Sequence, residues 1–229
     1  MKTIGLIGGM SWESTVTYYQ LLNEGVKDAL GGLHSAKILL YSVDFFEIEA
    51  LMSRGEWDEA ANVLGDASAR LETAGADMIL ICTNTLHKVA PQVQARIRVP
   101  LVHIAKAAAE RLRARGISRV GLLGTKYTMT QAFYREKLIE GGVDVIIPEG
   151  DDIELVNRVI FDELCLGVVK EESRAEYLRV IASLQQRGAE GILLGCTELG
   201  LIVAEEDVSI PVFDTTRIHA EKAFRLALE

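Results

Sequence analysis

Two segments of this 229-residue chain match each other about half the chain apart. Residues 75–84 read GADMILICTN and residues 188–197 read GAEGILLGCT, at an offset of 113 residues. The alignment pairs Thr83 with Cys196. A hydroxyl and a thiol at equivalent positions of a duplicated unit suggest two groups that act on opposite sides of one ligand.

Two further pairs of segments repeat with nearly the same spacing. Residues 3–8 (TIGLIG) match residues 119–124 (RVGLLG) at an offset of 116, and residues 99–103 (VPLVH) match residues 210–214 (IPVFD) at 111. Insertions and deletions in loops produce such a small drift. We therefore predict two tandem units, residues 1–114 and residues 115–229.

Short apolar runs alternate with amphipathic stretches in both predicted units. Apolar runs that stop at a glycine or a polar turn predict strands, and apolar residues at helical spacing predict helices. Gly75 and Gly188 are expected to end two of the helices in the left-handed conformation. The alternation predicts an α/β fold of two pseudo-symmetric parallel-sheet units with the active site between them. The expected strands are 3–7, 37–42, 78–82, 120–123, 143–147 and 192–195, and the expected helices include 14–30, 58–74, 130–140 and 172–187.

Charge, hydropathy and cysteine content exclude several classes of protein. The chain has 24 Lys and Arg against 33 Asp and Glu, a net charge of −9, without a basic cluster that would follow a phosphate backbone, so nucleic acid is not an expected partner. The first residues lack the apolar length of a secretory signal, and no apolar run reaches the length of a membrane span. Cys82, Cys165 and Cys196 lack metal-ligand spacing. We expect a soluble, cytoplasmic protein with free thiols and no metal site.

Small polar side chains follow four of the predicted strands. Ligands of open α/β sheets bind beyond the carboxyl ends of the strands, and the N–H groups that begin the next helix favour an anion such as a carboxylate. Gly5, Gly8 and Gly9 lack the order G-x-G-x-x-G, so tight turns are expected there and a dinucleotide cofactor is not. The candidate substrate-binding residues are Met10, Ser11, Asn84, Thr85, Thr125, Thr128 and Thr197.

Cys196 and Thr83 are the candidate catalytic residues. Cys196 lies where a predicted strand meets a predicted helix, and a helix N-terminus would stabilise its thiolate. Thr83 could cap the helix that follows it. An aliphatic hydroxyl cannot act as a free base near neutral pH, whereas a thiol titrates near about 8.5. Proton chemistry that uses this pair is therefore expected to be asymmetric.

The remaining cysteines and histidines are weaker candidates. Cys82 and Cys165 are expected to be small buried apolar residues, although Cys165 could line the pocket. His34, His103 and His219 lack metal spacing and are expected to be structural. His87 follows the turn after Asn84, where it could polarise the site or lie solvated on a helix surface.

The chain resembles the cofactor-independent aspartate/glutamate racemase family over its whole length. The motifs are Ile7-Gly8-Gly9-Met10-Ser11, Cys82-Thr83-Asn84-Thr85-Leu86-His87, Leu123-Gly124-Thr125 and Gly195-Cys196-Thr197-Glu198. The resemblance implies a homodimer and one catalytic cysteine from each half, acting without pyridoxal phosphate or metal. Here Thr83 occupies the first cysteine position, so the chain looks closest to members with a Thr/Cys pair, described as L-aspartate/glutamate or broad-specificity amino-acid racemases.

A second departure from the family concerns the substrate. Aspartate-specific members carry an arginine and a lysine for the distal carboxylate, and the corresponding positions here are Glu49 and Cys165. The resemblance therefore implies a wider or less acidic substrate range. Two alternatives stay open: a decarboxylase of the same superfamily that protonates an enediolate with one cysteine, and an inactive amino-acid-binding protein.

Overall fold

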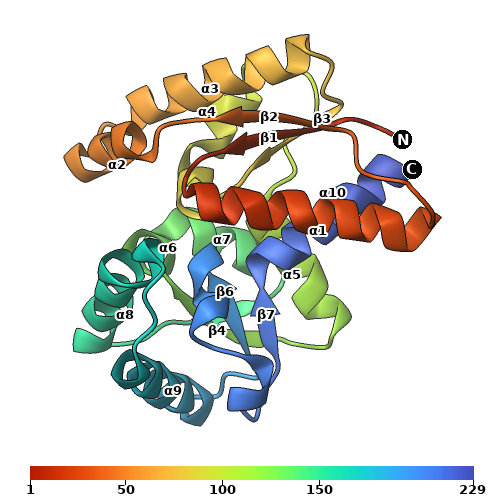
Figure 1. The fold of residues 1–229 in the computed structure, drawn as a ribbon. Helices are drawn as coiled ribbons and strands as arrows, with labels where there is room; N and C mark the ends of the chain where they lie inside the picture. Colours follow the sequence, from red (N-terminus) through yellow and green to blue (C-terminus); the bar gives the residue numbers. More distant parts are fainter. The chain divides into compact units, whose positions relative to one another are not determined.

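A computed structural model describes residues 1–229 and contains two parallel sheets, one in each of two compact units. Unit 1 comprises residues 1–104 and 219–229, and unit 2 comprises residues 105–218. Figure 1 shows both sheets with helices packed against them. The predicted α/β class with parallel sheets is confirmed. No helix is both long enough and apolar enough to cross a membrane.

Unit 1 is built on a three-stranded sheet with the order β2-β1-β3. The helix predicted from residue 14 begins at Trp12, because Ser11 accepts a hydrogen bond from the Ser14 N–H and caps it. Gly75 has a φ of +100° and follows α3, as the sequence predicts. The elements are β1 (Ile4–Gly8), α1 (Trp12–Leu30), β2 (Ile38–Ser42), α2 (Phe45–Arg54), α3 (Trp57–Thr73), β3 (Met78–Ile81), the 3₁₀ helix η1 (Thr85–Val89), α4 (Ala90–Gln94) and most of α10 (Thr215–Leu228).

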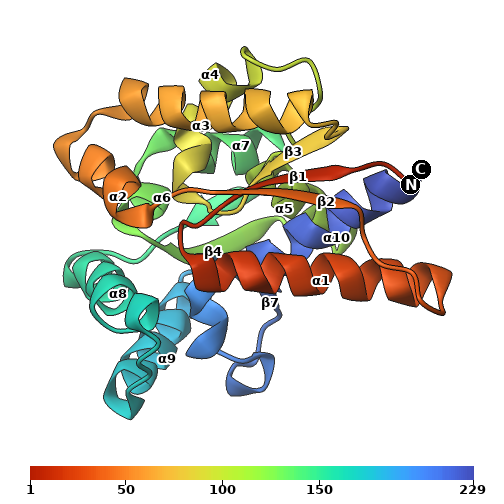
Figure 2. The same ribbon diagram turned by 45° about the horizontal axis from the view of Figure 1, so that its top comes forward.

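Helices cover both faces of the unit 1 sheet (Figures 1 and 2). One core cluster joins α2, α3 and α4 to the sheet, and a second joins α1 and α10 to the opposite face. Strand β1 is buried along its whole length, which explains its unbroken apolar run.

The C-terminal helix α10 packs on unit 1, although the sequence repeat assigns it to the second half of the chain. The Lys2 N–H donates to the Ala227 carbonyl at 2.8 Å. A Cβ built on Gly25 of α1 would lie 2.3 Å from the Phe224 ring, so α1 approaches α10 closely only with glycine there. The boundary predicted at 114/115 falls at the end of α5. The two compact units instead divide after Ile104, near the start of α5, and again after Ile218.

Unit 2 is built on a four-stranded sheet with the order β5-β4-β6-β7. Its main core cluster joins α8 and α9 to β4 and β6. The helix predicted over residues 130–140 corresponds to α7 (Ala132–Glu140), and Thr130 is the last residue of the separate short helix α6. The elements are α5 (Ile104–Ala114), β4 (Arg119–Gly124), α6 (Lys126–Thr130), α7 (Ala132–Glu140), β5 (Asp144–Ile146), α8 (Asp151–Asp162), η2 (Leu164–Leu166), α9 (Glu171–Gln186), β6 (Gly191–Gly195), η3 (Thr197–Leu201), η4 (Glu205–Asp207) and β7 (Val212–Asp214).

The two units repeat the same local contacts at equivalent positions. The Asp77 carboxylate accepts the Thr3 N–H at 2.6 Å, and the Glu190 carboxylate accepts the N–H of the equivalent residue Arg119 at 3.1 Å. Residues 79 and 192 likewise receive equivalent partners, since Ile79 pairs with Gly5 and bridges to Leu101 while Ile192 pairs with Gly121 and Val212. Thr83 and Cys196 each lie four residues beyond these isoleucines. Thr83 and Cys196 therefore occupy equivalent positions beyond the ends of β3 and β6.

Candidate active site

The first half-site lies beyond the ends of β1 and β3 in unit 1. These strands are paired through Ile7 and Ile81, and the Cys82 N–H donates to the Ile7 carbonyl at 2.9 Å. Thr83 is the next residue and is half-buried. Its hydroxyl forms no hydrogen bond within the protein, so it can bond to a ligand.

The chain turns directly after Thr83 through Asn84 and Thr85, both of which are buried. The following element is the 3₁₀ helix η1, and its N-cap is Asn84. The idea that the Thr83 side chain caps a helix is therefore wrong. What the Thr83 backbone offers instead is its carbonyl, which contacts the His87 Nδ1 at 2.7 Å.

His87 is a buried bridge between two backbone segments and not a solvated surface residue. Its Nε2 accepts the Ile104 N–H at 3.2 Å, which requires the other ring nitrogen to carry the proton. The Nδ1–H therefore donates to the Thr83 carbonyl. Burial lowers the pKa of His87 to about 4, so the ring is neutral at physiological pH. In that state His87 fixes the backbone of Thr83.

His219 is a second buried histidine, and its ring centroid lies 5.7 Å from that of His87. The His219 Nδ1 contacts the Tyr18 hydroxyl at 2.8 Å, and its Nε2 contacts the Val102 carbonyl at 2.6 Å. Because a carbonyl only accepts, Nε2 is protonated and the tyrosine hydroxyl donates to Nδ1. Burial lowers the pKa of His219 to about 3, with a smaller contribution from His87.

Acid is expected to destabilise the protein through these two histidines. Both pKa values lie below the ordinary 6.5, so the unfolded chain binds more protons than the native one and stability is lost as pH falls below 6.5. Between pH 6.5 and pH 5 we expect a loss of about 1.6 kcal/mol per histidine in the free energy of unfolding. Urea denaturation over this range measures it. A constant free energy of unfolding from pH 7 to pH 5 would contradict neutral burial.

The segment after β1 also belongs to the first half-site. Ser11 caps α1, and Thr15 accepts the Gly9 N–H while donating to the Ser11 carbonyl. Met10 is buried in the core cluster shared with α2 and α3. The Ser11 side chain is therefore engaged with α1, and the Met10 side chain packs in the core.

The second half-site lies beyond the ends of β4 and β6 in unit 2. Gly124 and Gly195 are paired in the sheet, and a Cβ on Gly124 would lie 3.0 Å from the Gly195 carbonyl oxygen. Thr128 fills the space beside both glycines and is fully buried. Its hydroxyl lies 3.2 Å from that of Thr125, the N-cap of α6. These two threonines support the strand end from which Cys196 projects.

Cys196 contacts a buried carboxylate two residues further along the chain. Its Sγ donates to the Glu198 Oε2 at 2.9 Å, and the Thr197 hydroxyl donates to the same oxygen at 2.6 Å. Glu198 is only 8% exposed. A thiol, a hydroxyl and a carboxylate are thus joined in one hydrogen-bonded group. The sequence motifs predict Cys196 and Thr197 at the site but give Glu198 no role.

The pKa of Cys196 is raised well above its ordinary value, first by burial and then by the charge and hydrogen bond of Glu198. The expectation that a helix N-terminus stabilises the Cys196 thiolate is therefore wrong. The element after Cys196 is the short 3₁₀ helix η3, and the side chain caps nothing. The structure holds a neutral thiol bonded to a proton acceptor.

The other two cysteines differ from Cys196 in their surroundings. Cys82 is fully buried among apolar residues of β1, α1 and α10, and burial raises the pKa of its thiol. Cys165 is half-buried in η2 and packs against the same core cluster as Cys196. The neighbouring Glu163 is bonded to Ser173 and Lys170. No group of three or more His, Cys, Asp and Glu side chains is arranged to hold a metal ion.

Comparisons with known proteins identify the family. A family model described as Asp/Glu/Hydantoin racemase matches residues 7–223. The broad specificity amino-acid racemase RacX of Bacillus subtilis is 22% identical, over 93% of this chain and 92% of that protein.

Solved structures agree with this match. A Yersinia pestis protein proposed to be an Asp/Glu racemase is 54% identical over the full length of both chains, with a TM-score of 0.95. An aspartate racemase homologue from Pyrococcus horikoshii is 39% identical over the full length of both chains, with a TM-score of 0.88. With its two-unit fold and its paired strand-end motifs, this chain belongs to the Asp/Glu/hydantoin racemase family.

Proposed function

We propose that this protein is an amino-acid racemase that works without a cofactor, with Cys196 and Thr83 on opposite faces of the substrate α-carbon. The observation that carries the proposal is the equivalent place of the two residues in the repeated units, each four residues beyond an isoleucine with the same strand partners. A pair of groups related by such a repeat can remove a proton from one face and return one to the other.

Cys196 would act as the base through Glu198. The carboxylate accepts the thiol proton along the existing 2.9 Å hydrogen bond, and the resulting thiolate removes the α-hydrogen of an L-amino acid. On the other face, the Thr83 hydroxyl or a water that it positions gives a proton to the carbanion, and the configuration inverts. Each turnover leaves one additional proton on the Cys196–Glu198 pair and removes one from Thr83 or its water, so proton exchange with solvent must restore both groups before the next turnover.

The carbanion requires stabilisation because the α-hydrogen of an amino acid is a very weak acid. Fixed hydroxyl, amide and backbone N–H dipoles at the two strand ends would stabilise the negative charge that develops on the substrate carboxylate. We assign substrate binding and this stabilisation to residues around the two half-sites, namely the backbone of Met10, whose side chain packs in the core, and Ser11, Asn84, Thr85, Thr125, Thr128 and Thr197.

The substrate range is proposed to be broad. Glu49 accepts a hydrogen bond from Ser53, and Cys165 packs against the apolar core cluster of unit 2, so neither side chain supplies a cation for a distal carboxylate. The name of the Bacillus subtilis relative also states broad specificity for that protein. The decarboxylase and binding-protein alternatives receive no comparable support, since the family model carries the name of racemases and the Bacillus subtilis relative is named a racemase.

One experiment tests the proposed function. The purified protein is incubated with single L-amino acids in deuterated water without added cofactor, and the products are separated by chirality. Racemisation predicts D-amino acid that carries deuterium at the α-carbon. Retention of protium in every amino acid would contradict a racemase. In a parallel incubation with malonates, release of carbon dioxide without any racemisation of amino acids would support the decarboxylase.

Removing the acceptor of the thiol proton is expected to slow the reaction. In Glu198→Gln the side chain keeps its shape but cannot accept a proton, so kcat should fall by about 10²-fold. The exposed Glu206→Gln is the matched control and should keep the wild-type rate. Because the charge of Glu198 raises the pKa of Cys196, a purely electrostatic role predicts the opposite result, a variant that is more active at low pH.

We also propose that the protein is a cytoplasmic homodimer. Its three cysteines are free, as a reducing compartment requires. Trp12, Val16 and Tyr19 lie on one face of α1 and are 65%, 54% and 56% exposed, a spacing suited to contact with a second copy. A molar mass of 25.1 kDa by light scattering, the mass of one chain, would exclude the dimer.

A further inference from the structure

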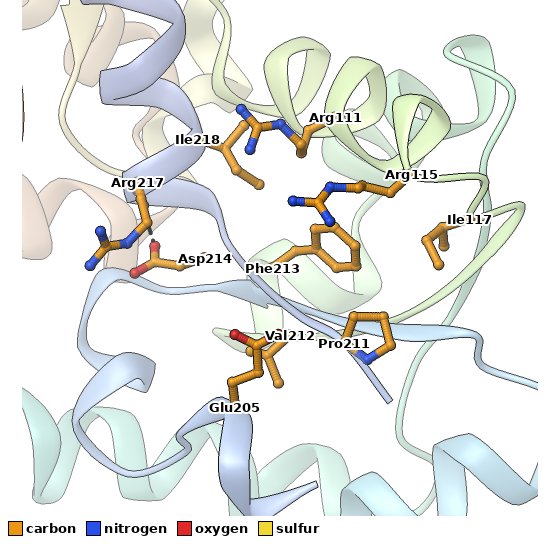
Figure 3. A pocket seen from close by; sticks show the side chains of 10 residues that line it. All are labelled: Arg111, Arg115, Ile117, Glu205, Pro211, Val212, Phe213, Asp214, Arg217 and Ile218. Atoms are coloured by element: carbon orange, nitrogen blue, oxygen red, sulfur yellow. Dashed lines mark hydrogen bonds between the residues drawn. The ribbon is translucent and has the colours of Figure 1, made fainter. Parts of the chain in front are cut away.

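A cavity of about 250 Å³ in unit 2 lies along the edge strand β7, and neither of the residues assigned to catalysis lines it. Three arginines line it in a chain whose net charge is −9. Figure 3 shows Arg111 and Arg115 entering from the α5 side, with Arg217 and Asp214 at the left and Glu205 below. The remaining lining is mostly apolar and comes from β7 and its neighbours.

Arg115 is the arginine best suited to a ligand. It is exposed, and its guanidinium forms no ion pair within the protein. In Figure 3 it lies above the Phe213 ring on the same side of the cavity as Arg111. A guanidinium offers paired N–H donors that match a carboxylate, and a nearby apolar surface makes such a contact stronger by excluding water.

The two acidic residues set the charge that the cavity accepts. Asp214 is compensated by backbone donors, since its Oδ1 accepts the Thr216 N–H at 2.7 Å and the Arg217 N–H at 3.2 Å. Glu205 is exposed. Three cations and two carboxylates leave one net positive charge, which suits a monoanion better than a phosphate dianion.

We infer that this cavity binds a small monocarboxylate with an apolar body, its carboxylate on Arg115 and Arg111 and its apolar part on Phe213, Val212 and Ile218. This ligand site is separate from the proposed racemase site and does not depend on that activity. Both α5 and the start of α10 contribute to it, so a bound ligand would join two helices that are distant in the sequence.

Benzoate is a suitable probe because it combines a carboxylate with an apolar ring. Benzamide keeps the ring without the charge, and acetate keeps the charge without the ring. We expect benzoate to bind the full-length protein at least 10-fold more tightly than either of them by titration calorimetry. In ¹H–¹⁵N spectra the amide shifts should be confined to residues 111–118 and 211–218.

The variant Arg115→Gln removes the proposed contact from an exposed position. It should weaken benzoate binding at least 10-fold while leaving racemisation unchanged. Arg113→Gln removes the same charge two residues earlier in the chain, at the end of α5 and outside the cavity, where Arg113 donates to the Gly141 carbonyl at 3.4 Å, and it should bind benzoate normally. Absence of benzoate binding, equal binding by Arg115→Gln, or equal weakening in Arg113→Gln would each overturn the site.

Discussion

Replacing Cys196 by serine is expected to lower the racemisation rate about 10²-fold or more while the protein remains folded. The substitution keeps a small polar side chain beside Glu198 but exchanges a thiol for a hydroxyl, whose much higher pKa prevents it from acting as the base. The comparison of kcat for the wild type and Cys196→Ser, with thermal unfolding as the measure of folding, tests this.

Cys165→Ser is the matched control for this substitution. Cys165 is half-buried in the same unit and packs against the same core cluster, so the chemical change and its surroundings are similar. Turnover should be retained in this control, although the preferred amino acid can change if Cys165 lines the pocket. Near-normal turnover in Cys196→Ser would rule out the proposed base.

Much of the fold follows from local sequence signals. The buried strands have unbroken apolar runs, and Gly75 and Gly188 end their helices with φ values of +100° and +96°, as expected from glycine in the left-handed region. The repeat also paired Thr83 with Cys196, which the strand register places equivalently. These features depend on neighbouring residues or on a duplicated pattern, so one sequence is enough to predict them.

The features that the sequence did not predict depend on contacts between distant residues or on side-chain direction. The buried His87 ring accepts the N–H of Ile104, 17 residues further along the chain. Helix α10 joins unit 1 because Phe224 packs against Gly25 of α1. The pKa of Cys196 is raised first by burial and then by the Glu198 carboxylate, which turns back toward the thiol within a 3₁₀ helix. Periodicity and spacing carry no information about these contacts.

Exchange with solvent is expected to differ between the two enantiomers, because Thr83 and Cys196 differ as bases. In deuterated water the thiol that takes the α-hydrogen of an L-substrate exchanges it, and return of the label to the same face gives deuterated L-substrate without inversion. An aliphatic hydroxyl does not reach a near-neutral pKa, so the D-face supports little such return. A carbanion formed from the D-isomer is therefore deuterated mostly by Cys196 and is released as labelled L-product. The D-substrate that has not reacted keeps its protium.

Thr83→Cys is expected to remove this asymmetry by placing a thiol on the D-face. Deuterium should then enter the unreacted D-substrate at least about 10-fold faster than in the wild type, since a thiol is a far better base than a hydroxyl. Thr83→Ser keeps the hydroxyl and should behave like the wild type. The equilibrium constant stays at unity in all three proteins because the enantiomers have equal free energy, so the final ratio of enantiomers does not distinguish them. The measured quantity is therefore the rate at which deuterium enters the unreacted substrate. Equal exchange from both enantiomers in the wild type, or an unchanged D-isomer in Thr83→Cys, would show that Thr83 does not serve the D-face.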